Sequence, residues 1–298
     1  MSWTLHTLDL GEVELNQRRM VANADAPGVV RVPVQGWLLV QGDMRVVIDT
    51  GFRFPDILKR LGDNASGIEQ PQQRLIEQLR LHGLAPADVN YVLHTHLHID
   101  HAGQTDQFPM STVAVVNRRE LEYAVSGLSG PSYPPEDIKH FIDRLHTRGA
   151  LWLLDLEATG GETVLPGLRC LNAGGHTEGS MLVVADTDQG VAVFCGDLIY
   201  SVRHQLLTPT TTFRDLGTSA NHVVARRQEK AALKRMMQVA PRFRLFPSHD
   251  WPVWVENGQV VEGAEACLSG RAAGCWCQQT SLGYPDTDLA TDRDRSPA

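Results

Sequence analysis

The feature that most constrains this chain is six residues long, His96-Leu97-His98-Ile99-Asp100-His101. Four of these side chains can bind metals, and the segment closely follows the apolar run Tyr91-Val92-Leu93. With His at 12 of 298 positions, the pattern is expected by chance roughly once in a thousand such chains. Imidazole and carboxylate groups together suit zinc and neighbouring first-row metals. A metal site at the end of a strand is therefore a better interpretation than a solvated polar loop.

The register of this pattern starts at His96 and not at His94. If the pattern began at His94, its first two ligands would be His94 and His96, and position 98 would have to be a carboxylate. Position 98 is a His instead. We therefore interpret His94 as an ordinary residue near the strand end, with a supporting role behind the ligands as the alternative. A tight turn after the strand would let His96 and His98 bind one metal. Asp100 and His101, displaced along the turn, would then face a second metal.

Four ligands cannot complete two metal sites, so the others must come from elsewhere in the chain. Three later segments each place one candidate ligand at the end of an apolar run: His176, Asp197 and His249. Each is weak by itself, because a lone His after a strand is more often structural. Together, and in this order after the first segment, they predict that several strand ends converge on one site.

The complete set resembles the pattern of the metallo-β-lactamase superfamily, in which His-x-His-x-Asp-His is followed by His, Asp and His. The resemblance covers roughly residues 30–255 and is greatest to the subgroup that contains the quorum-quenching N-acyl-homoserine lactonases. It implies seven ligands for two metal ions: His96, His98 and His176 for one, Asp100, His101 and His249 for the other, and Asp197 as a bridge. Asp49, in Val47-Ile48-Asp49-Thr50-Gly51, resembles a residue that supports the metal site from behind the ligands.

Two further residues refine the resemblance. Asp197 stands where the main zinc β-lactamases have Cys, and Cys195 lies two residues too early to replace it, so a dedicated β-lactamase is disfavoured. Tyr200 matches a tyrosine that these lactonases use close to the substrate carbonyl or leaving oxygen, although a packed aromatic is an equally good interpretation. Gly174 and Glu178 depart from the common Pro-Gly-His turn of the family. These two changes affect the turn around His176 and leave the ligand in place.

Strands and helices alternate along the chain. Short strands are predicted at 29–34, 37–40, 45–48, 91–93, 112–116 and 151–154. Apolar residues at helical spacing predict helices at 75–82, at 138–145 and from about 222 to 239. This order, with strand hairpins at the start, predicts an α/β protein. Its expected architecture is an αββα sandwich, in which two mixed β-sheets pack together and helices flank them.

The length and the composition suit one metallo-hydrolase domain over 1–265 with a C-terminal extension over 266–298. The extension is rich in Asp and poor in apolar residues from about 285, which predicts disorder there. Cys275 and Cys277 lie in it without a second pair, so we interpret them as incidental, with metal binding as the alternative. Cys170 and Cys195 lie in apolar runs and are expected to be small core residues.

The net charge of −8 argues against a nucleic-acid partner. No apolar stretch approaches the ~20 residues that span a bilayer, and no signal peptide is evident, so we expect no membrane partner and a cytoplasmic location. A homodimer is an open alternative to a monomer.

The resemblance implies a hydrolase that uses two divalent ions, with Zn²⁺ as the default and Mn, Fe or Co as alternatives. The expected substrate is a small-molecule ester or lactone, with an N-acyl-homoserine lactone as leading candidate. Asp100 would carry a proton to the leaving oxygen, and Tyr200 would donate a hydrogen bond to the developing oxyanion. Four aromatic residues are candidate walls for an acyl chain, with ordinary anchoring of a loop as an equally good interpretation of each: Phe52, Phe54, Tyr133 and Phe213.

Three alternatives remain open at this point. A thioesterase and a phosphotriester or aryl-ester hydrolase of the same superfamily would use the same ligands. A metal-binding scaffold or sensor without turnover is the non-enzyme alternative.

Overall fold

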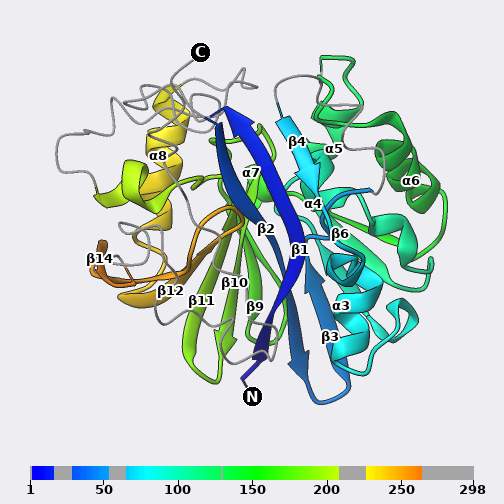
Figure 1. Cartoon of the computed structure of the whole chain (residues 1–298), viewed down its shortest axis with the longest axis horizontal. Coiled ribbons are helices and arrows are strands. Elements are labelled where there is room, and N and C mark those ends of the chain that lie inside the picture. The colour runs from blue at the N-terminus through cyan, green and yellow to red at the C-terminus, as the bar shows by residue number, and fades with distance from the viewer. Residues whose placement is uncertain (1, 17–28, 54–64, 129, 208–225, 264–298) are drawn as a thin grey trace, which may run out of the picture.

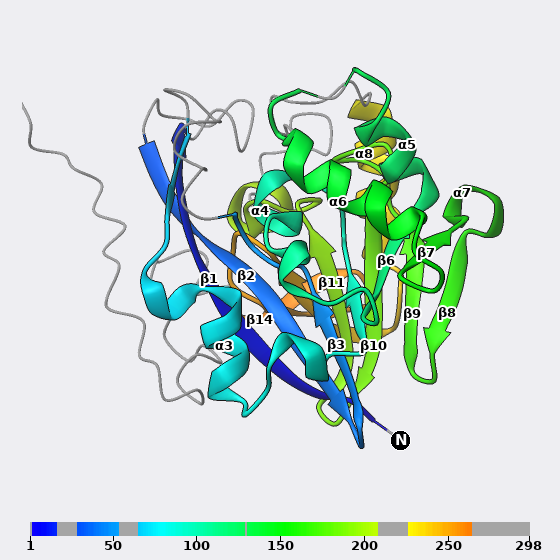
Figure 2. The ribbon, with the colours of Figure 1, turned by 90° about the vertical axis from the view of Figure 1, so that its right-hand side faces the viewer.

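Two seven-stranded sheets pack face to face, and helices cover their outer faces (Figure 1 and Figure 2). The structure is a computed structural model that describes residues 2–16, 29–53, 65–128, 130–207 and 226–263. The αββα sandwich predicted from the sequence is therefore confirmed.

The first sheet has the strand order β4-β1-β2-β3-β5-β6-β7. Its strands are β1 (Thr4–Asn16), β2 (Val29–Gln41), β3 (Met44–Ile48), β4 (Ala65–Ile68), β5 (Tyr91–Leu93), β6 (Val113–Asn117) and β7 (Leu151–Leu154). Strands β1 and β2 form a long antiparallel hairpin, whereas β3, β5, β6 and β7 run parallel. The parallel strands bring their carboxyl ends to one edge of the sheet, which is where α/β proteins bind ligands.

The second sheet has the strand order β14-β13-β12-β11-β10-β9-β8. Its strands are β8 (Gly161–Leu165), β9 (Leu168–Asn172), β10 (Met181–Thr187), β11 (Gly190–Gly196), β12 (Arg242–Pro247), β13 (Val253–Glu256) and β14 (Gln259–Glu262). Strands β11 and β12 are parallel, and β9 runs in the same direction because β10 is antiparallel to both β9 and β11. The carboxyl ends of β9, β11 and β12 therefore also meet at one edge.

Side-chain alternation along the strands builds the layers. In β2, Trp37 and Leu39 point into the core between the sheets, and Leu38 points to the outer face. Trp37 meets Phe194 and Phe246 of the second sheet, with ring centroids 4.9 Å and 6.3 Å away. These aromatic contacts join the two sheets at the centre of the molecule.

The helices cover the outer faces with separate apolar clusters. Those of the first sheet are α3 (Leu75–Leu81), α4 (Ile99–Ala102), α5 (Arg118–Ala124) and α6 (Pro135–Leu145), with α7 (Leu156–Thr159) before β8. Helix α8 (Arg226–Met236) packs its Leu233 and Met236 against the second sheet, as expected from the sequence. No helix among the described residues is long and apolar enough to cross a membrane.

One break predicted within a strand was wrong. The strands predicted at 29–34 and 37–40 are one continuous strand, β2, because it pairs with β1 along its whole length. The remaining pieces agree closely: β5 and β7 have the predicted bounds, and α3 and α6 occupy the two predicted helical segments. Cys170 and Cys195 are buried in the core, also as predicted.

Some predictions concern residues outside the described part of the chain. These are the extension over 266–298, its disorder from about 285, the pair Cys275 and Cys277, and the aromatic residues Phe54 and Phe213. The single domain over 1–265 stays a prediction.

Candidate metal centre

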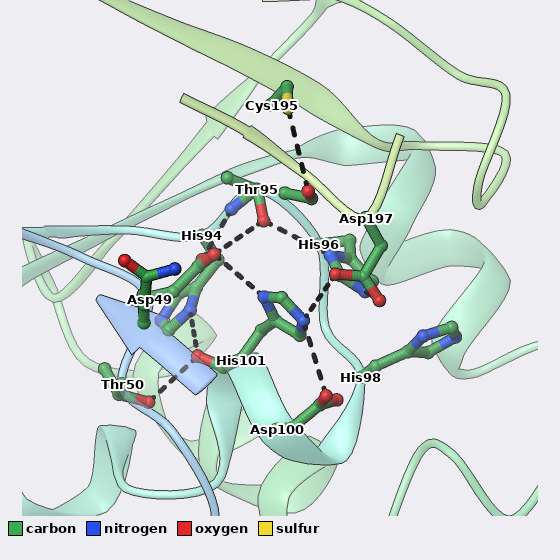
Figure 3. Close-up of polar contacts among 12 residues, drawn as sticks. Asp49, Thr50, His94, Thr95, His96, His98, Asp100, His101, Cys195 and Asp197 are labelled. Carbon is green, nitrogen blue, oxygen red and sulfur yellow. Dashed lines mark hydrogen bonds and ion pairs between the residues drawn. The ribbon is translucent and has the colours of Figure 1, made fainter. Parts of the chain in front are cut away.

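The predicted ligands lie at one end of the sandwich, where loops from the two sheets meet. The turn after β5 carries His96, His98, Asp100 and His101, and the last two belong to the short helix α4 (Figure 3). The loops after β9, β11 and β12 carry the other three, His176, Asp197 and His249. The structure therefore brings all seven predicted residues together, in two groups that share Asp197.

The first group consists of three imidazoles and one carboxylate oxygen. His176 Nε2 lies 3.1 Å from His96 Nε2 and 3.0 Å from His98 Nδ1. Asp197 Oδ2 lies 3.4 Å from His176 Nε2 and 3.8 Å from His96 Nε2. All four side chains are buried.

The second group uses the other oxygen of the same carboxylate. Asp197 Oδ1 lies 3.0 Å from His101 Nε2 and 3.2 Å from His249 Nε2. Asp100 Oδ2 completes the group, 3.2 Å from His249 Nε2 and 3.7 Å from His101 Nε2. Asp197 thus offers one oxygen to each group, which is the arrangement that a bridging ligand requires.

Hydrogen bonds behind three imidazoles point their Nε2 lone pairs into the groups. His249 Nδ1–H donates to the carbonyl of Pro33 (2.8 Å), and His101 Nδ1–H donates to Asp49 Oδ2 (2.9 Å). The Thr95 hydroxyl donates its proton to Asp49 Oδ2 (2.7 Å), so it can only accept from His96 Nδ1–H (3.2 Å). Imidazoles that bind metals almost always donate their other N–H in this way.

These tautomers make the two groups suitable for cations. In a neutral His101 the Nε2 lone pair would then face the lone pairs of Asp197 Oδ1 at 3.0 Å, and among the described residues neither buried atom has a hydrogen bond, so this position favours a cation, either a proton or a metal ion. Ligand atoms around a tetrahedral zinc ion at ~2.0–2.1 Å would lie about 3.3–3.4 Å apart, close to the 3.0–3.8 Å separations found here. Donor set and spacing therefore fit two divalent ions.

The charges of the site favour a cation as well. Burial would lower the pKa of His249, but the Asp197 and Asp100 carboxylates raise it to about 10. Burial acts in the same way on His101, and Asp197, Asp100 and Asp49 hold its pKa well above its ordinary value. The pKa of His96 is held well below its ordinary value, mainly by burial and to a smaller extent by the neighbouring imidazoles. The second group thus lies in the more negative potential.

Asp49 connects the two groups from behind. Its Oδ1 accepts Thr95 N–H (2.8 Å), and its Oδ2 accepts both the Thr95 hydroxyl and His101 Nδ1–H (Figure 3). Through Thr95 it fixes His96 of the first group, and it fixes His101 of the second directly. Its backbone has a φ of 56°, a left-handed conformation that Asp tolerates better than most residues.

His94 belongs to neither group. It is fully buried, its Nδ1–H donates to the carbonyl of His101 (3.2 Å), and burial lowers its pKa to about 3. Thr50 N–H donates to the same carbonyl at 2.7 Å. His94 is therefore a neutral residue that holds the backbone of a predicted ligand, which corresponds to the alternative left open by its position in the sequence.

The aromatic residues divide into two kinds. Tyr200 is half-buried, and its ring stacks on His249 (5.5 Å) and meets the edge of His176 (5.4 Å), so it lies beside both groups. Phe52 does not fit the prediction of an acyl-chain wall, because it is 1% exposed inside the cluster beneath α3. The Tyr133 hydroxyl is bonded to Glu120 and its ring lies edge-on against His98 at 4.7 Å, so its place in an acyl-chain wall stays a prediction.

Two polar residues of the site were not singled out from the sequence. Thr95 lies between His94 and His96, so in the sequence it is indistinguishable from an ordinary residue at a strand end. Glu120 lies in a helix with an ordinary pattern of charged residues. Both act through contacts with residues distant in the chain, so no local signal could have identified them.

Comparison with known proteins gives a consistent result. The family model described as the metallo-beta-lactamase superfamily matches residues 29–249. A curated relative, N-acyl homoserine lactonase AiiB of Agrobacterium fabrum (strain C58 / ATCC 33970), is 28% identical over 198 residues, which cover 59% of this chain and 70% of AiiB. Several further relatives are matched over 48% of their own length.

Solved structures share the fold. An N-acyl homoserine lactone hydrolase with N-hexanoyl-L-homoserine bound at its catalytic metal centre has a TM-score of 0.64 and 21% identity, over 80% of this chain and 89% of that one. AidC, a dizinc quorum-quenching lactonase, has a TM-score of 0.59 and 16% identity, over 83% of this chain and 87% of AidC.

Proposed function

This chain belongs to the metallo-beta-lactamase superfamily, and from that premise we propose that it is a hydrolase that binds two divalent metal ions and opens the ring of N-acyl-homoserine lactones. The observation that carries the proposal is the position of Asp197, whose two oxygens each join one of two adjacent groups of ligands. The relatives named as lactonases supply the substrate class.

The proposed ligands are those expected from the sequence. His96, His98 and His176 would hold one ion, and Asp100, His101 and His249 the other, with Asp197 shared. Ions at these positions would provide Lewis-acid activation of the ester carbonyl and of water. We propose zinc for both, in view of the His-rich donor set and the dizinc relative.

The residues around the groups have distinct proposed roles. Water adds to the lactone carbonyl carbon, and the ring C–O bond breaks. Asp100, whose side chain is 13% exposed beside His249, would carry one proton of this water to the leaving alkoxide, which becomes the hydroxyl of the product. The other proton is released as the carboxylate forms. Tyr200, stacked on His249, would donate a hydrogen bond to the oxyanion.

Two measurements test the proposal. Metal analysis of the purified protein should give close to two ions per chain, and a value near zero after expression in metal-supplemented medium would refute the dinuclear centre. The metal-loaded protein should convert N-hexanoyl-homoserine lactone to the ring-opened acid, followed by chromatography. Thioesters, aryl esters and phosphotriesters serve as competing substrates. If one of these turned over while the lactones stayed intact, the substrate class would be wrong and the metal centre would stand.

A cytoplasmic location, a homodimer and the lack of a nucleic-acid partner stay predictions.

A further inference from the structure

A buried carboxylate outside the seven proposed ligands is hydrogen-bonded to residues directly beside three of them. Glu120, on α5, has an exposure of 0%. Its Oε1 accepts hydrogen bonds from Leu97 N–H (2.9 Å) and the Tyr133 hydroxyl (2.9 Å). Its Oε2 accepts from the Thr177 hydroxyl (2.6 Å) and from Gly179 N–H (3.2 Å). Both oxygens are therefore occupied by donors.

The positions of these donors connect Glu120 to the first group of ligands. Leu97 lies between His96 and His98, and Thr177 directly follows His176. One oxygen therefore holds the turn after β5 of the first sheet, and the other holds the turn after β9 of the second sheet. The imidazoles of the second group of ligands are held by other residues: Asp49 holds His101, and the Pro33 carbonyl holds His249.

The surroundings make this arrangement rigid. Asn117, at the start of α5, donates from its side chain to the Gly179 carbonyl (3.0 Å), so the first turn of the helix binds both polar groups of Gly179. A Cβ on Gly179 would lie 2.0 Å from Glu120 N, which means that only glycine permits this approach. Tyr133 extends the contact to a ligand, because its ring packs edge-on against His98 at 4.7 Å.

We infer that Glu120 is a positioning residue that sets the geometry and affinity of one of the two metal ions, the one held by His96, His98 and His176. The inference rests on the proposed function in assuming that metal binds there. Glu120 would then position only the ligands of the first ion, whereas Asp49 positions ligands of both ions.

A carboxylate is needed because the two backbone donors reach different oxygens. Leu97 N–H and Gly179 N–H cannot accept a hydrogen bond. In Glu120→Gln, one of the two oxygens becomes an amide NH₂ that faces one of these N–H groups. The side-chain volume is retained, but one turn loses its anchor. Changes to residues that support ligands typically weaken metal binding 10- to 100-fold.

The experiment compares Glu120→Gln with Glu122→Gln, which removes an exposed charge from the same helix. Stepwise competition of Zn²⁺ with a chelator gives two dissociation constants, and His176→Asn and His249→Asn identify the ion to which each belongs. We expect Glu120→Gln to weaken the first ion about 10- to 100-fold and to change the second less than about threefold. The visible spectrum of the Co²⁺-loaded protein should change for the first ion, because it reports ligand geometry. Glu122→Gln should match the wild type.

Two results would overturn the inference. Unchanged affinity for both ions in Glu120→Gln would show that the anchor is dispensable, and equal weakening of both would show general loosening. If Glu120→Gln does not fold, Thr177→Val replaces it. This change removes the 2.6 Å bond to Glu120 Oε2, together with the 2.6 Å bond to Ser180 Oγ inside the His176 turn, and the same selective loss is required. A wild-type protein that binds no metal would instead refute the proposed function itself.

Discussion

Asp49→Asn is the sharpest test of how the site is built, because Asp49 fixes the tautomers of His96 and His101 through three buried hydrogen bonds. Asn keeps the size of Asp and tolerates the left-handed backbone at φ 56°, so backbone strain does not enter. An amide, however, has one oxygen where the carboxylate has two. Its NH₂ must face either Thr95 N–H or the Nδ1 atom of His101.

Both orientations have a cost that can be worked out. If the amide NH₂ faces Thr95 N–H, that buried donor loses its acceptor, which costs about 1–3 kcal/mol of free energy. Facing His101 Nδ1 moves the imidazole proton to Nε2, where it blocks the lone pair that would bind the metal. With 1.36 kcal/mol for each tenfold change, the expected weakening of metal binding is about 5- to 150-fold.

Chelator competition at pH 7.5 measures the two dissociation constants, with near-UV circular dichroism to verify the fold. Asp43→Asn, in the exposed turn between β2 and β3, is the matched control and should bind both ions like the wild type. The reasoning is refuted if Asp49→Asn folds normally and both dissociation constants stay within about twofold of the wild-type values.

Three other changes have defined outcomes. Tyr200→Phe should keep both ions and slow turnover at least about tenfold in kcat, and an unchanged kcat would remove the hydroxyl from the mechanism. Gly179→Ala should lower stability by about 1–3 kcal/mol in urea unfolding, because its Cβ meets Glu120, while Gly130→Ala, with open space around it, should have little effect. Burial raises the pKa of the Glu69 carboxyl to about 7, so stability should fall as pH rises from about 4.5 through 7. Glu69→Gln should therefore match the wild type in melting temperature at pH 4 and exceed it at pH 8; equal melting temperatures at pH 8 would contradict this.

All seven residues brought together at the site could be predicted from the sequence, because each lies in a segment that follows a strand and their order resembles the metallo-β-lactamase pattern. Four of them lie within six residues, and His176, Asp197 and His249 each end an apolar run. Strand ends are local features, and parallel strands carry such ends to a common edge. The fold class followed from the same alternation of elements.

The supporting residues could not be predicted in this way. Glu120 lies 23 residues from Leu97 and 57 from Thr177, and only the packing of α5 brings them together. Phe52 was misjudged for a related reason, since the sequence does not show how deeply an aromatic residue in a loop is buried. The division of β2 into two strands failed because pairing with β1 outweighed the local signals of Pro33 and Gly36.

Each group of ligands is drawn from both sheets of the sandwich, with His96 and His176 as one example and His101 and His249 as the other. An ion bound at either position would therefore cross-link the two sheets, in addition to any chemistry it performs. Its binding free energy would add to the stability of the fold, by about 4 kcal/mol when free metal exceeds the dissociation constant a thousandfold. The supply of metal would thus set the lifetime of the protein as well as its activity. A chain starved of metal should lose resistance to proteolysis together with turnover, so that idle molecules are degraded instead of stored.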